Sequence, residues 1–259
     1  MGHTLRIDLN CDIGESTGPQ RMDAEERLLT RVTSANIACG FHAGNPELMR
    51  RTVRLARAHR VAIGAHPGFR DPEALGRREV ALSPAEVENL VAYQVGALAG
   101  ITALEGAQLS HVKPHGALYN MAARDSGLAT AVARAVAAVD RHLILVGLAG
   151  SKLIEAARTL GLTAAEEAFA DRAYNPNGTL VPRDRPHAVI HDENEVVTRV
   201  LRLVRDSLVP AIDGQPVRIH ADTICIHGDT VGADPLAQAI RRSLTEAGVR
   251  IAALGSTNA

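Results

Sequence analysis

The first strand-like stretch of the chain reads Leu5-Arg6-Ile7-Asp8-Leu9-Asn10-Cys11-Asp12-Ile13-Gly14-Glu15. Successive residues of a strand point to opposite sides. The odd-numbered positions from 7 to 11 therefore make one side apolar, and the even-numbered positions place Asp8, Asn10 and Asp12 on the other. A strand with a wholly polar side is unusual for a buried parallel sheet, so this pattern directs the interpretation of the rest of the chain.

Two later stretches are divided in the same way. Their polar sides carry His111, Lys113 and His115 in one case and Cys225, His227 and Asp229 in the other. If the apolar sides of such strands pack against helices, the polar sides line the interior of the sheet or barrel. Polar groups there are costly unless they pair with one another, with a metal or with a substrate. A purely structural polar network is the alternative to a functional site.

Strand-like and helical segments alternate almost to the end of the chain. The expected strands are residues 5–10, 35–39, 61–66, 109–114, 143–148, 164–169, 223–227 and 250–254. The expected helices are residues 23–32, 46–59, 84–104, 128–139, 151–160, 193–208 and 235–247. This alternation predicts a parallel α/β fold in one domain spanning residues 1–259. The irregular stretch 170–191 is too long for an ordinary connection and indicates a functional loop.

A closed barrel and an open doubly wound sheet share this alternation. Ligands of an open sheet bind mainly where the strand order reverses, whereas a barrel site draws on the loops after many strands. Polar, glycine-containing runs follow at least six of the expected strands here. We therefore predict a distorted (β/α) barrel of seven or eight parallel strands.

Composition and charge exclude several classes of protein. The 259 residues carry a formal net charge of −1, 46% hydrophobic residues and six aromatic residues. Nucleic acid is not expected as a partner, because there is no basic cluster and few rings are available for stacking. Three widely spaced cysteines suit a reducing compartment. With neither a signal-peptide core at the start nor an uncharged apolar stretch near ~20 residues, we expect a cytoplasmic protein without a membrane span.

Four histidines follow four different strands: His42, His66, His115 and His227. All four should meet at one rim of a barrel, where metal ligation or proton transfer are their chemical options. No H-E-x-x-H spacing is present, so a zincin site is not indicated. Asp12 or Asp8 together with two of the histidines would suit a divalent ion.

Lys113 is one of only two lysines in the chain and is expected to face inward. A buried lysine can bind phosphate or act as a base with a lowered pKa. The structural alternative is an ion pair with Asp8 or Glu15. Arginines in long loops, Arg77 and Arg172 among them, could clamp a carboxylate or a phosphate. A Walker phosphate loop and a Gly-x-Ser-x-Gly elbow are both missing.

Several longer strings resemble the LamB/YcsF family, the A subunit of the prokaryotic ATP-dependent 5-oxoprolinase. The most specific are Ser34-Ala35-Asn36-Ile37-Ala38-Cys39-Gly40-Phe41-His42-Ala43-Gly44 and His111-Val112-Lys113-Pro114-His115-Gly116-Ala117-Leu118-Tyr119-Asn120. Further matches, in family order, are Asp8 to Glu15, Gly64 to Gly68, Gly76-Arg77-Arg78, Tyr93-Gln94, Glu167 to Tyr174 and Cys225 to Thr230. A small departure is Ala74-Leu75, where the family usually has Gly-Phe.

The resemblance implies a distorted barrel similar to the glycoside hydrolase/deacetylase-like superfamily. It also implies a cytoplasmic hydrolase that opens the lactam of 5-oxo-L-proline to L-glutamate while ATP is hydrolysed to ADP and phosphate. Partner subunits B and C are part of this implication, and a homo-oligomer is compatible with it. If ATP is used, Mg²⁺ is the expected divalent ion.

On this interpretation the site residues fall into three groups. The residues expected to be catalytic are Asp12, Lys113, His115 and Asp229. The residues expected to bind substrate are Asn10, Glu15, His42, Arg77, Tyr119, Arg172 and His227. The residues expected to hold a metal are Asp12, His42 and His66.

Two other functions remain as alternatives. The barrel analogy allows a stand-alone metal-dependent amidohydrolase or carbohydrate deacetylase, although fold analogy alone is a weak basis for function. A non-catalytic scaffold subunit with a ligand-binding interior is the other.

Overall fold

The computed structural model of the protein describes residues 5–15, 19–226 and 232–256. Its strands are β1 (Arg6–Ile13), β2 (Ser34–Ala38), β3 (Ala62–His66), β4 (His111–Val112), β5 (Ile144–Leu148), β6 (Ala164–Phe169), β7 (Leu208–Pro210), β8 (Pro216–Arg218), β9 (Thr223–Cys225) and β10 (Arg250–Ile251). Its helices are α1 (Pro19–Leu29), α2 (Pro46–Ala58), α3 (Pro84–Leu104), α4 (Gly116–Arg124), α5 (Ser126–Val139), α6 (Lys152–Thr159), α7 (Glu193–Asp206) and α8 (Ala233–Glu246).

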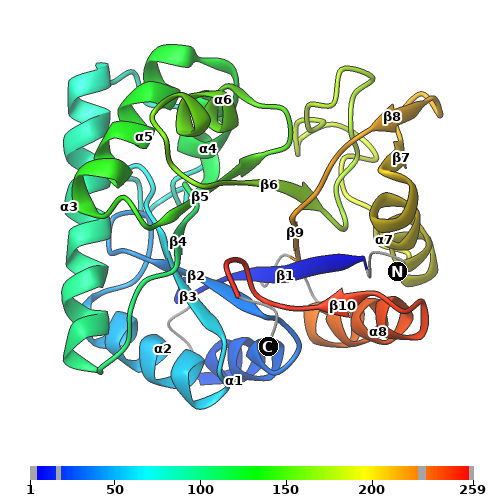
Figure 1. Ribbon diagram of the computed structural model, residues 1–259, viewed down its shortest axis with the longest axis horizontal. Coiled ribbons are helices and arrows are strands. Elements are labelled where there is room, and N and C mark those ends of the chain that lie inside the picture. The colour runs from blue at the N-terminus through cyan, green and yellow to red at the C-terminus, as the bar shows by residue number, and fades with distance from the viewer. Residues whose placement is uncertain (1–4, 16–18, 227–231, 257–259) are drawn as a thin grey trace.

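Seven parallel strands close into a barrel in the order β1-β2-β3-β4-β5-β6-β9, with β9 pairing back onto β1 (Figure 1). The eighth parallel strand, β10, pairs only with Arg6 and Ile7 at the start of β1, whereas β9 pairs with the following residues 8–10. The two strands thus divide one edge of β1 between them. This arrangement confirms the predicted distorted barrel of seven or eight strands.

The helices lie around the outside of the barrel (Figure 1). Ile7, Leu9 and Cys11 of β1 are fully buried and belong to the main hydrophobic core with the inner faces of the helices. Asp8 and Asn10 are equally buried, at 1% and 2% exposure, on the opposite side of the strand. The period-two prediction for β1 is therefore confirmed. All three cysteines of the chain are buried and none forms a disulfide bond.

Helix α3 is long and apolar enough, by length and composition, to suit a membrane span, although no such span was expected from the sequence. It begins at Pro84 with a complete capping box between Ser83 and Glu86, which satisfies backbone N–H groups at the helix start. Val87, Val91 and Leu98 are fully buried, and the helix packs mainly against α5 and α2. One face of the helix therefore contributes to the core, while 33% of the apolar window is buried in all.

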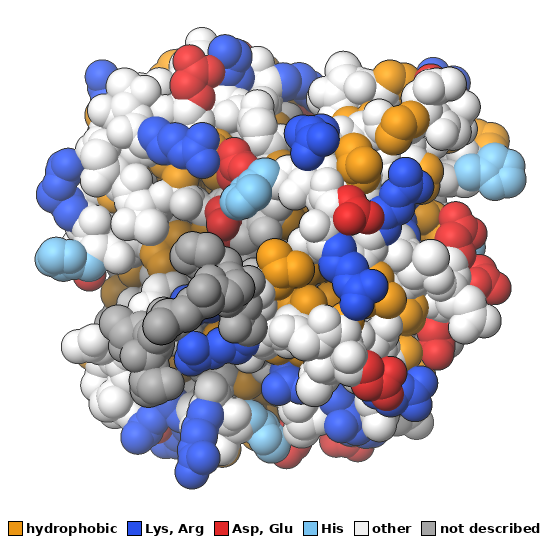
Figure 2. Space-filling view, turned by 45° about the vertical axis from the view of Figure 1, so that its right-hand side comes forward, with side chains coloured by type: hydrophobic (Ala, Val, Ile, Leu, Met, Phe, Trp, Pro, Cys, Tyr) orange, Lys and Arg blue, Asp and Glu red, His pale blue; other side chains and the backbone are white. Residues whose placement is uncertain are grey.

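Three elements were not predicted from the sequence. Helix α4 follows His115 directly, and β7 and β8 form a small antiparallel hairpin between α7 and β9. The long stretch 170–191 is irregular as predicted; isolated bridges join Arg172 to Val189 and Tyr174 to Leu180 within it, and one joins Tyr174 to Ala211 outside it. On the face seen in Figure 2, side chains of both charge signs are interspersed, as expected from the nearly balanced composition.

Candidate active site

The barrel interior holds a ladder of hydrogen-bonded polar side chains that begins at Asp8. Its Oδ1 accepts hydrogen bonds from Thr33 Oγ1 at 2.6 Å and Ser34 Oγ at 2.7 Å, and its Oδ2 accepts one from Thr223 Oγ1 at 2.5 Å. Burial raises the pKa of the Asp8 carboxyl, and these hydroxyl donors oppose the shift. Asp8 is thus a satisfied internal group, and none of these hydrogen bonds joins it to a residue of the rim.

The next layer is a network of amides one strand position closer to the rim. Asn10 Nδ2 donates to Glu167 Oε1 at 3.0 Å, and Asn36 Nδ2 donates to Asn10 Oδ1 at 2.8 Å. His111 Nε2 donates to Asn36 Oδ1 at 2.8 Å. Burial and the nearby Lys113 charge lower the pKa of His111 to about 3, so the ring is neutral. These hydrogen bonds join side chains from four strands, β6, β1, β2 and β4.

Lys113 lies at the centre of the barrel with 2% of its surface exposed. Its Nζ is 2.8 Å from Glu167 Oε1 and 3.0 Å from Asp12 Oδ1, and it also contacts Cys225 Sγ at 3.2 Å. Burial opposes the charged form, yet the surrounding Asp12, Cys225 and Glu167 raise the pKa of Lys113 well above its ordinary value. The group is therefore a permanent buried cation, and the lowered-pKa base considered from the sequence does not fit it. Its partners also differ from the Asp8 or Glu15 of the structural alternative, because those carboxylates lie in other layers.

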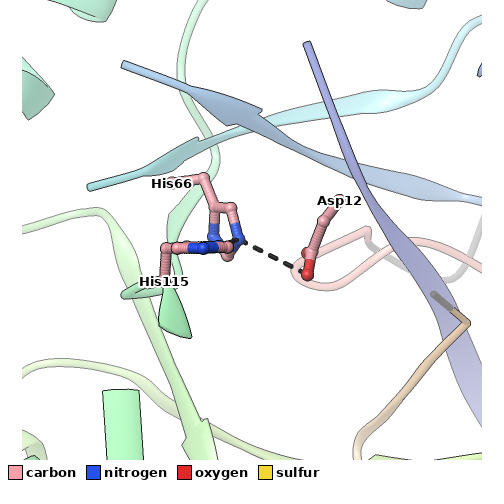
Figure 3. Close-up of side chains that lie close together, drawn as sticks. All are labelled: Asp12, His66 and His115. Atoms are coloured by element: carbon pink, nitrogen blue, oxygen red, sulfur yellow. Dashed lines mark hydrogen bonds and ion pairs between the residues drawn. The ribbon is translucent and has the colours of Figure 1, made fainter. Parts of the chain in front are cut away.

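Carboxylates and histidines meet at the rim of the barrel, above Lys113. His66 at the end of β3 and His115 before α4 direct ring nitrogens toward Asp12 of β1 (Figure 3). His66 Nε2 lies 3.4 Å from Asp12 Oδ2 and 2.9 Å from His115 Nδ1. Glu15 Oε1 lies 3.1 Å from the same His115 nitrogen. Two sets with metal-ligand spacing share His115: one is Asp12, His66 and His115, and the other is Glu15, His42 and His115.

His42 lies next to His115, on the side away from the pocket. Its ring stacks on His115 with centroids 3.9 Å apart and an angle of 3° between the planes, and its Nε2 is 3.1 Å from Glu15 Oε1. Burial and the nearby His66 lower the pKa of His42 to about 3, and burial with the two neighbouring histidines lowers that of His115 to about 3. For His66, burial opposes protonation but the Asp12 carboxylate outweighs it and raises the pKa. His42 thus supports Glu15 and His115.

Two glycines leave the room that these rings occupy. A Cβ on Gly68 would lie 2.7 Å from His42 Nδ1, and a Cβ on Gly76 would lie 2.8 Å from His42 Cβ. Gly76 also has φ +64°, a conformation that favours glycine. Its neighbour Leu75 supplies a backbone carbonyl that accepts from His115 Nε2 at 2.7 Å. The contact uses the backbone carbonyl of residue 75. A leucine side chain at this position, where the family usually has Phe, therefore leaves the contact unchanged.

A pocket of about 630 Å³ opens onto the rim. Its floor is formed by Asp12, Glu15, His66, Lys113 and His115, and its walls include residues of the β5–α6 connection and the long loop 170–191. Tyr119 and Phe169 form one wall, with ring centroids 5.9 Å apart in an edge-to-face contact. Burial and the nearby Glu167 raise the pKa of the Tyr119 hydroxyl well above 10, so it remains protonated near neutral pH. The pocket therefore offers both fixed charges and apolar surface.

Arg172 holds the long loop against the pocket. Its Nη2 donates to Val181 O at 2.6 Å and its Nε donates to Ala188 O at 3.3 Å. Burial lowers the pKa of Arg172 to about 10, and the nearby Arg183 acts in the same direction. Arg172 lines the pocket, and its hydrogen bonds also hold the loop in place.

Arg172→Ala is expected to loosen the loop. Two hydrogen bonds worth ~1 kcal/mol each would be lost, so local opening and proteolysis between residues 173 and 190 should become about tenfold or more faster. Amide hydrogen exchange and limited proteolysis would measure this. Arg185→Ala, which removes an exposed arginine of the same loop, is the matched control and should behave like the unaltered chain. Equal exchange in both variants would contradict the anchoring role.

The structure brings most of the predicted site residues together. Those that line the pocket are Asp12, Glu15, His66, Arg77, Lys113, His115, Tyr119 and Arg172. Asn10 lies one layer below Lys113, and His42 lies behind the floor. Two predicted residues, His227 and Asp229, lie outside the described residues. The predicted metal set of Asp12, His42 and His66 is divided: His42 groups with Glu15 and His115, while Asp12 and His66 group with His115.

Glu167 is a central residue that the site prediction omitted. It is fully buried and contacts both Lys113 and Asn10. A period-two division of β6 puts Glu167 on one side with Ala165 and Phe169, and Glu166 on the other with Ala164 and Ala168, so the rule leaves both glutamates as candidates. Asn36 could have been found in the same way on β2.

Comparisons with known proteins identify the family of the chain. The sequence model of the LamB/YcsF family matches residues 7–259. The chain belongs to the LamB/YcsF family. A LamB/YcsF relative from Bordetella pertussis, named as the A subunit of 5-oxoprolinase, is 55% identical over 247 residues, which cover 95% of this chain and 98% of the relative.

Solved structures extend the comparison to the fold. The lactam utilization protein from Thermus thermophilus is 47% identical and has a TM-score of 0.89, with 96% of this chain and 100% of that chain covered. A protein of Enterococcus faecalis with 14% identity has a TM-score of 0.55 over 96% of this chain and 97% of its own, which shows a likeness of fold alone. The LamB/YcsF barrel thus has structural relatives with very different sequences.

Proposed function

We propose that this chain is the A subunit of an ATP-dependent 5-oxoprolinase, which cleaves 5-oxo-L-proline to L-glutamate coupled to hydrolysis of ATP to ADP and phosphate. The observation that carries the proposal is the rim pocket, whose floor combines a permanent cation, two carboxylates and two histidines. The names of relatives about half identical over nearly the whole chain support it. The proposed partners are subunits B and C, and the proposed compartment is the cytoplasm.

The pocket suits a small lactam that carries a carboxylate. Arg77 and Arg172 on the walls could neutralise the carboxylate, because guanidinium groups match its geometry. Tyr119 and Phe169 could cover the ring methylenes with apolar surface. The pocket is much larger than one such molecule, which leaves room for a second reactant or a segment of a partner subunit.

Coupling to ATP follows from the chemistry of the bond. An unstrained lactam is a poor electrophile, and phosphorylation of its oxygen would turn the amide into an activated imidate that water attacks. The triphosphate would bring Mg²⁺ with it. We assign the rim histidines and Asp12 either to proton transfer or to holding a divalent ion, since they lie within reach of one another in the pocket floor. Lys113 would stabilise negative charge that develops on the reacting group.

Reconstitution tests this proposal directly. The purified chain, mixed with B and C subunits, 5-oxoproline and Mg-ATP, is expected to form glutamate and ADP in equal amounts, and omission of the chain should abolish glutamate. Amino-acid analysis and an ADP assay would follow both products. No glutamate from a trio whose B and C subunits work with an established 5-oxoprolinase of the same family would refute the assignment. Turnover of an amide by the single chain without ATP would favour the amidohydrolase or deacetylase alternative instead.

A further inference from the structure

We infer that Asp12, Glu15, His66 and His115 form the binding site of one divalent first-row transition-metal ion. The site belongs to the chain itself and does not depend on ATP or on the identity of the substrate. It differs from the set expected from the sequence, because His115 and Glu15 take the place of His42. What distinguishes these four side chains is the direction of their lone pairs.

Two backbone carbonyls fix which ring nitrogens carry hydrogen. His66 Nδ1 lies 2.7 Å from Lys113 O, and His115 Nε2 lies 2.7 Å from Leu75 O. A carbonyl oxygen can only accept a hydrogen bond, so each of these nitrogens must donate. In the neutral rings, His66 Nε2 and His115 Nδ1 are then bare lone pairs. These two nitrogens point toward each other and toward the carboxyl groups of the pocket floor.

The bare nitrogens face other acceptors. They lie 2.9 Å from each other, and Glu15 Oε1 is 3.1 Å from His115 Nδ1 and 3.9 Å from His66 Nε2. Asp12 Oδ2 is 3.4 Å from His66 Nε2. Acceptor atoms at such distances repel one another unless a proton or a cation lies between them.

A single added proton does not remove the repulsion between these acceptor atoms. One proton on His66 Nε2 can point to His115 or to Asp12, and it leaves the contact between Glu15 and His115 without a hydrogen. At least two added protons are needed, which is the charge that one divalent ion supplies. In the pocket floor, Asp12 and Glu15 supply two carboxyl groups beside the ammonium of Lys113, and Arg77 and Arg172 lie on the walls of the same pocket. A divalent ion between His66 and His115 would be attracted by the two carboxyl groups.

The surroundings fit a metal ion as well. Metal-binding histidines usually donate their second N–H to a carbonyl or carboxylate, as His66 and His115 do here. His42 stacks on His115 and contacts Glu15, so it holds both in place. Two imidazoles with two carboxylates suit ions such as Zn²⁺ or Mn²⁺ better than Mg²⁺, which prefers oxygen ligands.

All four residues line the pocket, so the ion would face it. A metal with an accessible coordination position supplies Lewis acidity and lowers the pKa of bound water. His42, by contrast, is fully buried and does not line the pocket. It is therefore a positioning residue.

Metal binding by the full chain tests the inference without any enzyme assay. Chelator-treated and dialysed protein is titrated with Zn²⁺ by calorimetry, and with Co²⁺ while the visible absorption is recorded. The unaltered chain should bind one ion and give Co²⁺ ligand-field bands. His66→Gln and Glu15→Gln should each weaken binding by roughly 100-fold or more, since even the outer partners of metal ligands contribute 10- to 100-fold. His142→Gln, at an exposed histidine, is the matched control and should bind as the unaltered chain does.

Circular dichroism establishes that each variant is folded. Glu15→Gln provides the test if His66→Gln does not fold. A folded, unaltered chain that takes up no stoichiometric Zn²⁺, Co²⁺ or Mn²⁺ overturns the inference, and so does binding that neither substitution weakens. Because no lactam or nucleotide is present, a negative result here is distinguishable from a failed reconstitution of the proposed reaction.

Discussion

Lys113→Ala is expected to abolish glutamate formation by the reconstituted complex and to destabilise the chain. The ammonium is held between Asp12 and Glu167, and it is 2% exposed. Its removal leaves two carboxylates facing each other in the barrel without a compensating charge. Breaking a buried ion pair in this way costs about 3–5 kcal/mol, and loss of one fixed electrostatic group in a site lowers the rate by roughly 100- to 1,000-fold.

The second lysine of the chain provides a control for this substitution. Lys152 is exposed and pairs only with Glu155, one turn along α6, so Lys152→Ala should change stability by less than about 1 kcal/mol and leave activity unchanged. Denaturant unfolding and the glutamate assay would compare the two variants. Lys113→Met keeps most of the side-chain volume and separates loss of charge from loss of packing. Full activity of Lys113→Ala would remove the role assigned to this lysine.

The polar barrel interior was predictable because a strand has a period of two. Asp8, Asn10 and Asp12 had to share one side of β1, and the apolar residues between them had to meet the helices. His111 and Lys113 followed by the same rule on the strand at residues 109–114. Strand β6 is less decisive, because Glu166 and Glu167 lie on opposite sides of it, and the three-dimensional contacts identify Glu167 as the inward one.

Other features depend on contacts that no local pattern encodes. His42 and His115 stack because Gly68 and Gly76 leave space for their rings, and these glycines come from a different loop. Helix α4 is only nine residues long and begins next to the rim motif, which gives it little periodicity. Strands β7 and β8 have three residues each, and both contain proline. Of the four histidines expected at one rim, His42, His66 and His115 do meet there, whereas His227 lies outside the described residues, and the pairing within the group required the three-dimensional arrangement.

Gly64→Ala is expected to displace His111 in the layer below the pocket floor and so to disturb the site. Gly64 of β3 is paired in register with His111 of β4, and a Cβ there would lie 2.1 Å from His111 Nε2. The buried ring would have to move and would lose its hydrogen bond to Asn36, the side chain that also donates to Asn10 and Asp12. Overpacking costs about 1–3 kcal/mol, and an unsatisfied buried group adds about 1–3 kcal/mol.

A total of roughly 3 kcal/mol corresponds to a melting temperature about 6–12 °C lower in a chain of this size. Gly96→Ala is the matched control, because nothing lies within 4 Å of a Cβ at this exposed position in α3. Replacing glycine by alanine inside a helix stabilises by about 0.5–1 kcal/mol, so the same chemical change should shift the melting temperature in opposite directions at the two sites. Gly64→Ala should also lower glutamate formation, since Asn36 holds Asp12 at the pocket floor. A Gly64→Ala chain as stable and active as the unaltered one would show that the amide layer does not position the rim.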